Sequence, residues 1–361
     1  MSLRERQQQA GALLAADGIP LHFGDQQAEY RAALEDAVLM DRSHEGGLEL
    51  HGRDRLSLPQ RISTNDLEAL ASGQGRPTLF TNPNGRILER AVIYHRGETA
   101  LAISEPGRAD ALRNYISRNI FFNDELRIVD TTALTHKFAL HGPKADAVIA
   151  RWQPELADLS AFGCRDLSVD GATVFVGQRK ALSGGHWLVI APIAQAETVW
   201  SALLTAGADL GLIPAGSLTY NVLRIRAGVP GAGRELSSDY IPLEVGLWDE
   251  VSFHKGCYTG QEIIARMESR GRLAKTIVTL RLSEPVASPA PLQYEGRQIG
   301  MLTSSVTSPI GEHLGIGVIK LRAAQTGAVL QVAEGGAQAE VVARAGAQPA
   351  ALTDEDEPNR A

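Results

Sequence analysis

The stretch Lys255-Gly256-Cys257-Tyr258-Thr259-Gly260-Gln261-Glu262 decides how the rest of this chain is interpreted. A threonine followed three residues later by a glutamate predicts a capping box: the Thr259 hydroxyl accepts from a backbone N–H of the first turn, and the Glu262 carboxylate accepts from the N–H of the cap. An apolar stripe follows at 263–267, and Gly271 is a typical left-handed stop. We therefore expect a helix of roughly three turns between the threonine and the glycine.

Cys257 lies two residues before the expected cap. Unpaired backbone N–H groups and the positive end of the helix dipole favour an anion at this place, and Lys255 adds a positive charge nearby. The stretch thus predicts an exposed thiol that readily forms a thiolate. The alternative is that Cys257 is a small buried apolar side chain, as most free cysteines are.

The 361 residues are 44% apolar and 21% charged, which is typical of a globular protein with two or three packed units. No apolar run approaches the ~18 residues that cross a membrane, and the first residues lack the apolar centre of a signal peptide. We therefore expect a cytoplasmic protein without a membrane partner. A net charge of −7 argues against direct nucleic-acid binding through a basic face.

The cysteine content predicts neither a disulfide framework nor a metal site. Cys164 and Cys257 are too few for a secreted disulfide scaffold or an all-cysteine zinc site. His254 lies three residues before Cys257, but both precede the expected helix, so nothing places them on one face. We expect reduced thiols and no bound metal.

Turn and strand signals organise the first three quarters of the chain. Two β-rich runs at 78–81 and 87–94 flank Asn82-Pro83-Asn84-Gly85, and an Asn-Gly pair in this setting is a strong hairpin signal. Farther along, 138–142 repeats the layout of 48–52, in which a short strand and a glycine precede a helix. We interpret this as a weak internal duplication of an α+β unit.

The C-terminal part has a different character. Short alternating strands separated by turns predict a small β-barrel, at 276–282, 298–304, 314–319, 329–332 and 339–342. The acidic end of the chain predicts a disordered tail. The expected domains are therefore a core at 1–272, a barrel at 273–345 and a tail at 346–361.

The run 255–262, continued by Ile264-Ala265-Arg266 and Arg270-Gly271, resembles the signature of the YgfZ-type folate-binding proteins. These proteins are relatives of the aminomethyltransferase (T-protein) of the glycine cleavage system, and the likeness covers most of the chain more loosely. It implies an α+β fold in which two related α+β units form an aminomethyltransferase-type folate-binding core, followed by the β-barrel. It also implies binding of tetrahydrofolate or a one-carbon derivative, support of iron–sulfur proteins as partners and, indirectly, a role in tRNA modification.

The resemblance also implies the residues of a folate site. A helix expected at 214–227 carries Tyr220, which would stack on the pterin or aminobenzoate, and Arg226 stands where relatives carry a glutamate that binds the pterin edge. A guanidinium only donates, so Arg226 would instead hold a folate carboxylate or another anion, or cover the surface. His44, in a polar turn that the likeness places at the folate, could move protons near neutral pH or be an exposed loop residue. The other folate-binding candidates are Arg224, Glu244, Lys255, Tyr258 and Arg266.

One position departs from the aminomethyltransferases. There, an aspartate on the second strand of the hairpin is the catalytic carboxylate, and the matching place here is Arg90. Adjacent strand residues face opposite sides, so Glu89 cannot replace that acid. Three hypotheses stay open: an accessory protein of the YgfZ type with Cys257 as its reactive thiol, an aminomethyltransferase of the glycine cleavage type, and a non-catalytic folate sensor or scaffold in which Cys257 is structural.

Overall fold

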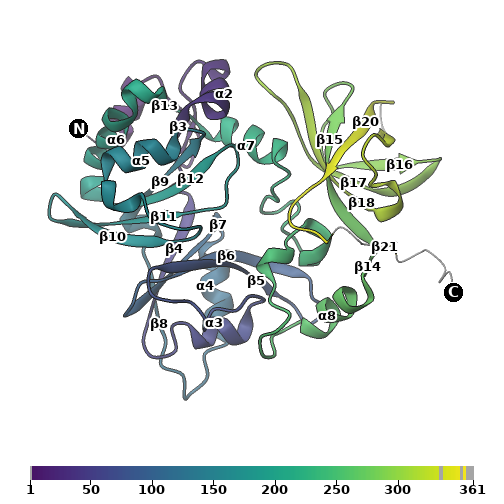
Figure 1. Cartoon of the computed structure of the whole chain (residues 1–361), viewed down its shortest axis with the longest axis horizontal. Helices are drawn as coiled ribbons and strands as arrows, with labels where there is room; N and C mark the ends of the chain where they lie inside the picture. Colours follow the sequence, from purple (N-terminus) through teal and green to yellow (C-terminus); the bar gives the residue numbers. More distant parts are fainter. Residues whose placement is uncertain (1, 333–335, 350–352, 355–361) are drawn as a thin grey trace. The chain divides into compact units, whose positions relative to one another are not determined.

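The computed structural model describes residues 2–332, 336–349 and 353–354 (Figure 1). The chain divides into two compact units. The first comprises Met1–Gln60, Leu67–Pro77 and Ala91–Tyr220, and the second comprises Arg61–Asp66, Thr78–Arg90 and Asn221–Ala361. The divisions fall inside α3 (Ser57–Ile62), β5 (Gln74–Thr81), β6 (Ile87–His95) and α7 (Ser217–Arg226), so these four elements contribute residues to both units.

A six-stranded sheet with the order β10-β11-β12-β9-β3-β13 forms the centre of the first unit. Its strands are β3 (Ala37–Asp41), β9 (Thr135–Gly142), β10 (Cys164–Val169), β11 (Ala172–Gln178), β12 (Gly185–Pro192) and β13 (Leu212–Pro214). The helices of this unit include α1 (Leu3–Gln9), α2 (Gln26–Glu35), α5 (Ala145–Trp152) and α6 (Ala196–Gly207). Side chains alternate across a strand, so each strand gives one set to each face of the sheet.

One face of this sheet packs on helices. Phe138 and Leu140 of β9 and Trp187 of β12 share a buried cluster with Val148 of α5 and Trp200 of α6. This cluster is the main apolar core of the first unit. Residues at the intervening strand positions, such as His141 on β9 and His186 on β12, therefore belong to the opposite face.

The second sheet has the order β5-β6-β7-β4-β8, with β4 (Glu45–His51), β7 (Thr99–Pro106) and β8 (Arg127–Asp130). It is accompanied by α3 (Ser57–Ile62) and α4 (Ala109–Arg118). Tyr94 of β6 and Ile103 of β7 share a smaller apolar cluster with Phe175 and Leu188 of the six-stranded sheet. Within the first unit, apolar side chains from both sheets thus pack together on the face of the six-stranded sheet that bears no helices.

A closed barrel with the order β15-β18-β17-β16-β19-β20 dominates the second unit. Its strands are β15 (Lys275–Leu282), β16 (Ala290–Tyr294), β17 (Arg297–Thr307), β18 (His313–Lys320), β19 (Val329–Val332) and β20 (Gln338–Arg344). The predicted mixed fold with a C-terminal barrel is confirmed. The sequence missed β16, because Pro291 interrupts its alternation and only five residues form the strand.

Near the N-terminus, α1 ends at Gln9, and β1 (Leu13–Leu14) follows and pairs with β2 (Pro20–His22). The hairpin is confirmed, and Gly85 in its turn has φ of 69°. The predicted domain boundaries stay a prediction. Within the expected tail, β21 (Thr353–Asp354) pairs with β14 (Arg272–Leu273), while 350–352 and 355–361 lie outside the described residues.

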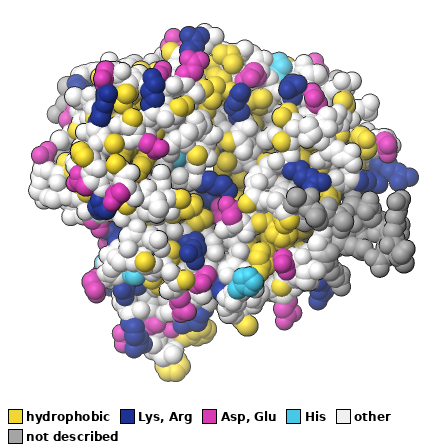
Figure 2. Space-filling model, in the orientation of Figure 1, with side chains coloured by type: hydrophobic (Ala, Val, Ile, Leu, Met, Phe, Trp, Pro, Cys, Tyr) yellow, Lys and Arg dark blue, Asp and Glu magenta, His cyan; other side chains and the backbone are white. Residues whose placement is uncertain are grey.

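The described residues include no helix that is long and apolar enough to span a membrane. On the face seen in Figure 2, basic and acidic side chains are interspersed over the surface.

Candidate functional site

Three charged side chains of the first unit, two of them buried, form a chain of ion pairs. Glu45, the first residue of β4, accepts from Arg42 Nε at 2.9 Å through one carboxylate oxygen and from Arg179 NH1 at 2.8 Å through the other. The side chains of Arg42 and Glu45 are 4% and 5% exposed. Burying charges is tolerated only when they are paired and hydrogen-bonded, so this arrangement requires all three members.

Aromatic rings surround the ion pairs. The guanidinium carbon of Arg42 lies 3.7 Å from the centre of the Tyr220 ring, and the ring of His141 lies 5.7 Å from the same ring. His141 and His186 face each other across neighbouring strands with ring centres 4.1 Å apart. We refer to Arg42, Glu45, His141, Arg179, His186 and Tyr220 as the arginine cluster.

Several polar atoms in and around the arginine cluster have no hydrogen-bond partner, although they are buried. They are both ring nitrogens of His141, Nε of Arg179 and Nδ1 of His44. His186, by contrast, uses Nδ1 with the carbonyl oxygen of Lys180 at 2.8 Å. Unsatisfied buried polar groups are rare and costly, and their concentration in one place is typical of a binding site.

The cluster has strongly shifted proton affinities. Burial alone would raise the pKa of Glu45, but the guanidiniums of Arg179 and Arg42 hold it well below its usual range. Burial, reinforced by the positive charge of Arg179, lowers the pKa of His186 to about 3. Burial also lowers the pKa of His141 well below 6.5, with His186 and Arg42 adding to the effect. Near neutral pH the cluster therefore holds an ionised carboxylate and two neutral histidines.

His44 has a different state from the one the sequence predicted. Burial, together with the charge of Arg42, lowers its pKa to about 4. A histidine with this pKa is neutral at pH 7 and cannot exchange protons readily there. The lowered pKa argues against proton transfer by His44 near neutral pH, and its main cause is burial of the ring, which local sequence does not reveal.

In the second unit, Arg90 is locked in a two-point ion pair. Its Nε and NH2 donate to the two carboxylate oxygens of Glu250 at 2.7 Å and 2.6 Å, and Glu250 is 1% exposed. The Thr64 hydroxyl donates to the backbone carbonyl of Glu250 at 2.7 Å. The resemblance to aminomethyltransferases requires a carboxylate at this position. The position instead holds the guanidinium of Arg90, whose charge is balanced by Glu250.

Cys257 is exposed, so the alternative of a buried apolar cysteine is wrong. The expected capping box is also wrong. Helix α8 (Gln261–Arg270) has Gly260 as its N-cap, with φ of 85° and no side-chain cap. A side chain on this glycine would collide with the carbonyl of Asn82, and the hydroxyl of Thr81 donates to the carbonyl of Thr259, so the close approach of the hairpin turn sets where the helix starts. The predicted stop at Gly271 is confirmed.

Lys255 and Tyr258 serve the structure of this stretch. The ammonium of Lys255 donates to the backbone carbonyls of Ser63 and Asn65 at 2.7 Å and 2.8 Å and lies 5.3 Å from the centre of the Tyr258 ring. Tyr258 is 7% exposed and belongs to an apolar core, and burial raises its pKa to about 12. Both side chains hold the residues on either side of Cys257 in place.

The remaining predicted folate-binding residues also have protein partners or point into solvent. Arg224 donates to Asn221 and Ser304 and lies 3.6 Å from Glu235, while Arg226 is exposed and pairs with Glu312 at 2.8 Å. Glu244 accepts from the backbone N–H of Ile241 at 3.1 Å and pairs with Arg86 at 3.3 Å, and Arg266 lies exposed on α8.

Tyr220 and Arg224, both on α7, have different partners. Tyr220 is the last residue assigned to the first unit and belongs to the arginine cluster, whereas the contacts of Arg224 lie in the second unit. The sequence missed Arg42, Glu45, His141 and Arg179. A signal existed for two of them, since Arg42 and Glu45 stand in a short polar run directly between two strands.

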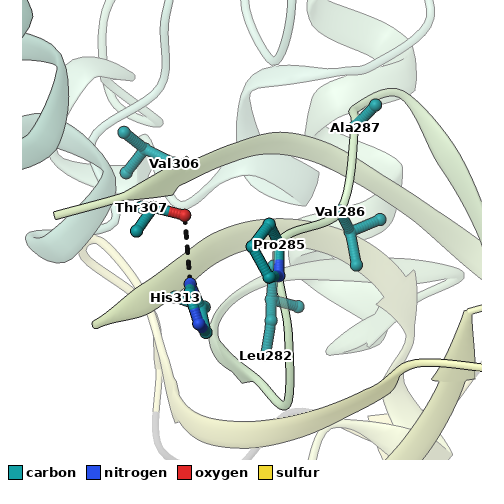
Figure 3. Close-up of a pocket in the computed structure, with 7 residues that line it drawn as sticks. All are labelled: Leu282, Pro285, Val286, Ala287, Val306, Thr307 and His313. Atoms are coloured by element: carbon teal, nitrogen blue, oxygen red, sulfur yellow. Dashed lines mark hydrogen bonds between the residues drawn. The ribbon is translucent and has the colours of Figure 1, made fainter. Parts of the chain in front are cut away.

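A pocket of about 240 Å³ opens in the barrel (Figure 3). Leu282, Pro285 and Val286 line it opposite Val306, and the hydroxyl of Thr307 lies 3.0 Å from Nδ1 of His313 at its edge. It contains none of the residues predicted for the folate site. Among the described residues, no group of three or more histidine, cysteine, aspartate or glutamate side chains could hold a metal ion.

Comparisons with known proteins agree with this architecture. A family model described as the GCVT N-terminal domain matches residues 16–255. A putative chloroplastic transferase of Arabidopsis thaliana is 32% identical over 329 residues, which cover 90% of this chain and 75% of the relative. An aminomethyltransferase of Moorella thermoacetica is 26% identical over 330 residues, which cover 90% of each protein.

A solved structure extends the comparison to the fold. The glycine cleavage system aminomethyltransferase T from Bartonella henselae aligns with a TM-score of 0.82 at 21% sequence identity, over 94% of this chain and 95% of that one. The family model covers most of the chain, and a relative above 30% identity accompanies it. The chain therefore belongs to the family defined by the GCVT N-terminal domain, together with aminomethyltransferases that are similar to it over most of their length.

Proposed function

We propose that this protein binds a reduced folate, tetrahydrofolate or a one-carbon derivative, and acts as an accessory protein of the YgfZ type that supports iron–sulfur proteins and, through them, tRNA modification. Cys257 is its reactive group. The observation that carries the proposal is the ion pair between Arg90, on the second strand of the hairpin, and Glu250.

The Arg90 pair argues against glycine cleavage chemistry. A carboxylate at this place would assist proton transfer at the folate nitrogen, which a guanidinium cannot do because it stays protonated and only donates. Glu250 does not replace the missing acid, because both of its oxygens accept from Arg90 and the side chain is 1% exposed. We infer that folate is bound by this chain without aminomethyl transfer.

The residues of the arginine cluster suit a folate. The ligand would bring carboxylates and a polar heterocycle, and the cluster offers guanidinium donors and the unpartnered ring nitrogens of His141. One face of the Tyr220 ring is covered by Arg42, so Tyr220 can stack on a ligand only through its other face. When bound, the folate would supply one-carbon or redox chemistry, while the chain's own residues bind and orient it.

The role of Cys257 rests on its exposure within a well-anchored stretch. The N–H of Ser252 donates to the carbonyl of Thr64 at 2.9 Å before the cysteine, and the carbonyl of Thr259 accepts from Thr81 after it. An accessible thiol on a fixed backbone can meet a partner protein without an ordering cost. Arg224, Arg226, Glu244 and Arg266 then support the second unit instead of contacting folate directly.

A genetic and a biochemical readout test the proposal together. Wild-type protein should restore iron–sulfur enzyme activity in a strain that lacks such an accessory protein, Cys257→Ser should not, and Cys164→Ala, which alters a buried cysteine, should behave as wild type. Purified protein should release no ammonia from a lipoyl-bound aminomethyl group in the presence of tetrahydrofolate. Ammonia release at an enzymatic rate would establish the aminomethyltransferase alternative, and rescue by Cys257→Ser would favour the folate sensor or scaffold.

A further inference from the structure

Arg42 has hydrogen-bonding capacity that its own chain leaves unused. Its Nε donates to Glu45, and this is the only side-chain hydrogen bond that Arg42 makes among the described residues. A guanidinium carries five N–H donors, so the four on its terminal nitrogens remain. The side chain is 4% exposed, so these donors are largely shielded from bulk water and could bind an acceptor on a ligand.

Two contacts fix the plane of this guanidinium. Glu45 holds its Nε edge, and the ring of Tyr220 lies against its face at 3.7 Å. Glu45 is itself fixed by Arg179, which donates to its second oxygen at 2.8 Å. The N–H groups on the terminal nitrogens of Arg42 are thereby held in a fixed orientation. Two such parallel donors match the two oxygens of a carboxylate better than a point charge does.

The local charge balance also favours an anion. Two guanidiniums, those of Arg42 and Arg179, share the single carboxylate of Glu45, and Glu105 adds a weaker electrostatic attraction to Arg42. The nearby histidines are neutral near pH 7, so the positive charge that would attract an anion comes from the two guanidiniums. One ring nitrogen of His141 and Nε of Arg179 add donors without partners.

We propose that Arg42 binds a carboxylate of the ligand and that, resting on the proposed function, this is a carboxylate of the glutamyl part of the folate. The assignment replaces Arg226, which the sequence suggested for this role. Arg226 is exposed, and its guanidinium is paired with both oxygens of Glu312. The guanidinium of Arg42 is buried, and its terminal nitrogens make no side-chain hydrogen bond within the described part of the chain. The glutamyl end is thus recognised by the arginine cluster of the first unit.

Calorimetry with three ligands on the full chain tests this proposal. They are 5-formyltetrahydrofolate, the matching pteroate without glutamate, and p-aminobenzoylglutamate, which lacks the pterin. We expect wild type to bind the folate at least ~10-fold more tightly than the pteroate, and Arg42→Gln to remove that preference while changing pteroate affinity by less than about twofold. Arg226→Gln is the matched control and should preserve the preference.

The outcomes separate this proposal from the proposed function. Folate binding without a preference for glutamate, or with a preference that survives Arg42→Gln, would overturn the role of Arg42 and leave folate binding intact. Binding of p-aminobenzoylglutamate that depends on Arg42, without binding of the folate, would support the carboxylate site and overturn folate as the ligand. If neither ligand binds wild type, both proposals are wrong.

A second variant covers the case in which Arg42→Gln does not fold, which a thermal melt would reveal. Arg42→Lys keeps the charge beside Glu45 but loses the two-point fork, so it should lower the preference for glutamate only partly. Full preference in Arg42→Lys would contradict the fork geometry. The comparison of ligands on wild type requires no variant, and the absence of a preference for glutamate would overturn the role of Arg42 in either case.

Discussion

The arginine cluster and the stretch around Cys257 are opposite in construction. The stretch is continuous in sequence, 255–262, and it places its cysteine in solvent. The cluster is assembled from the ends of β3, β4, β9, β11 and β12 and from α7, and most of its side chains are buried. The stretch around Cys257 can be recognised as a sequence motif, whereas the arginine cluster can be recognised only from contacts in the folded chain. We infer that the two regions divide the work, with ligand recognition in the cluster and thiol chemistry at Cys257.

The largest effect on stability should follow from removing Glu45. In Glu45→Leu two buried guanidiniums lose their shared carboxylate, and breaking a buried ion pair costs about 3–5 kcal/mol. Urea denaturation should show this loss in the free energy of unfolding. The matched control is Glu312→Leu, which breaks the exposed pair with Arg226 and should cost less than about 1 kcal/mol. Equal losses in the two variants would contradict the claim that the cluster is a buried electrostatic unit.

Acid should destabilise the cluster through its histidines. The pKa of His186 is about 3 in the folded chain against 6.5 ordinarily, so the unfolded chain binds this proton first as the pH falls. Its contribution is therefore fully present above about pH 6.5 and is lost towards pH 3, by about 1.4 kcal/mol per pH unit.

The variant His186→Asn isolates this contribution. Between about pH 6 and pH 4 its free energy of unfolding should fall less steeply than that of wild type, by about 1.4 kcal/mol per pH unit. His254→Asn, in the exposed residues before Cys257, is the control and should keep the wild-type slope. An unchanged slope in His186→Asn would show that the ring is not held neutral.

A smaller change in stability should show whether Lys255 anchors the backbone or activates the thiol of Cys257. Its ammonium donates to two backbone carbonyls, so Lys255→Met should lower the free energy of unfolding by about 1–3 kcal/mol. In native protein the rate at which iodoacetamide alkylates Cys257 should change by less than about threefold, because the ammonium is held by those carbonyls. A larger fall in alkylation rate with unchanged stability would restore the sequence interpretation, in which Lys255 activates the thiol.

The sequence predicted the parts of the fold that depend on local patterns. The Asn84-Gly85 turn, the stop at Gly271 and the alternating barrel strands each arise from neighbouring residues, and the structure confirms them. The start of α8 could not be predicted in this way. Gly260 becomes the cap because the hairpin turn leaves no room for a side chain there, and that contact joins residues far apart in the sequence.

The candidate site was predictable only in part, for the same reason. The exposure of Cys257 could be predicted from its own segment, whereas Tyr220 was singled out only through the family resemblance. Arg42 could not, because its meaning depends on Glu45 beside it and on Arg179, which the chain brings in from another strand. An arginine in a sequence usually indicates surface, and only the structure shows that Arg42 is buried.

The division of work between the two regions is tested most directly by calorimetry of 5-formyltetrahydrofolate with Arg42→Gln and Cys257→Ser side by side. The account predicts that Arg42→Gln weakens binding at least ~10-fold and that Cys257→Ser binds within about twofold of wild type. Tight binding by Arg42→Gln together with loss of binding in Cys257→Ser would contradict it, because recognition would then reside in the cysteine stretch.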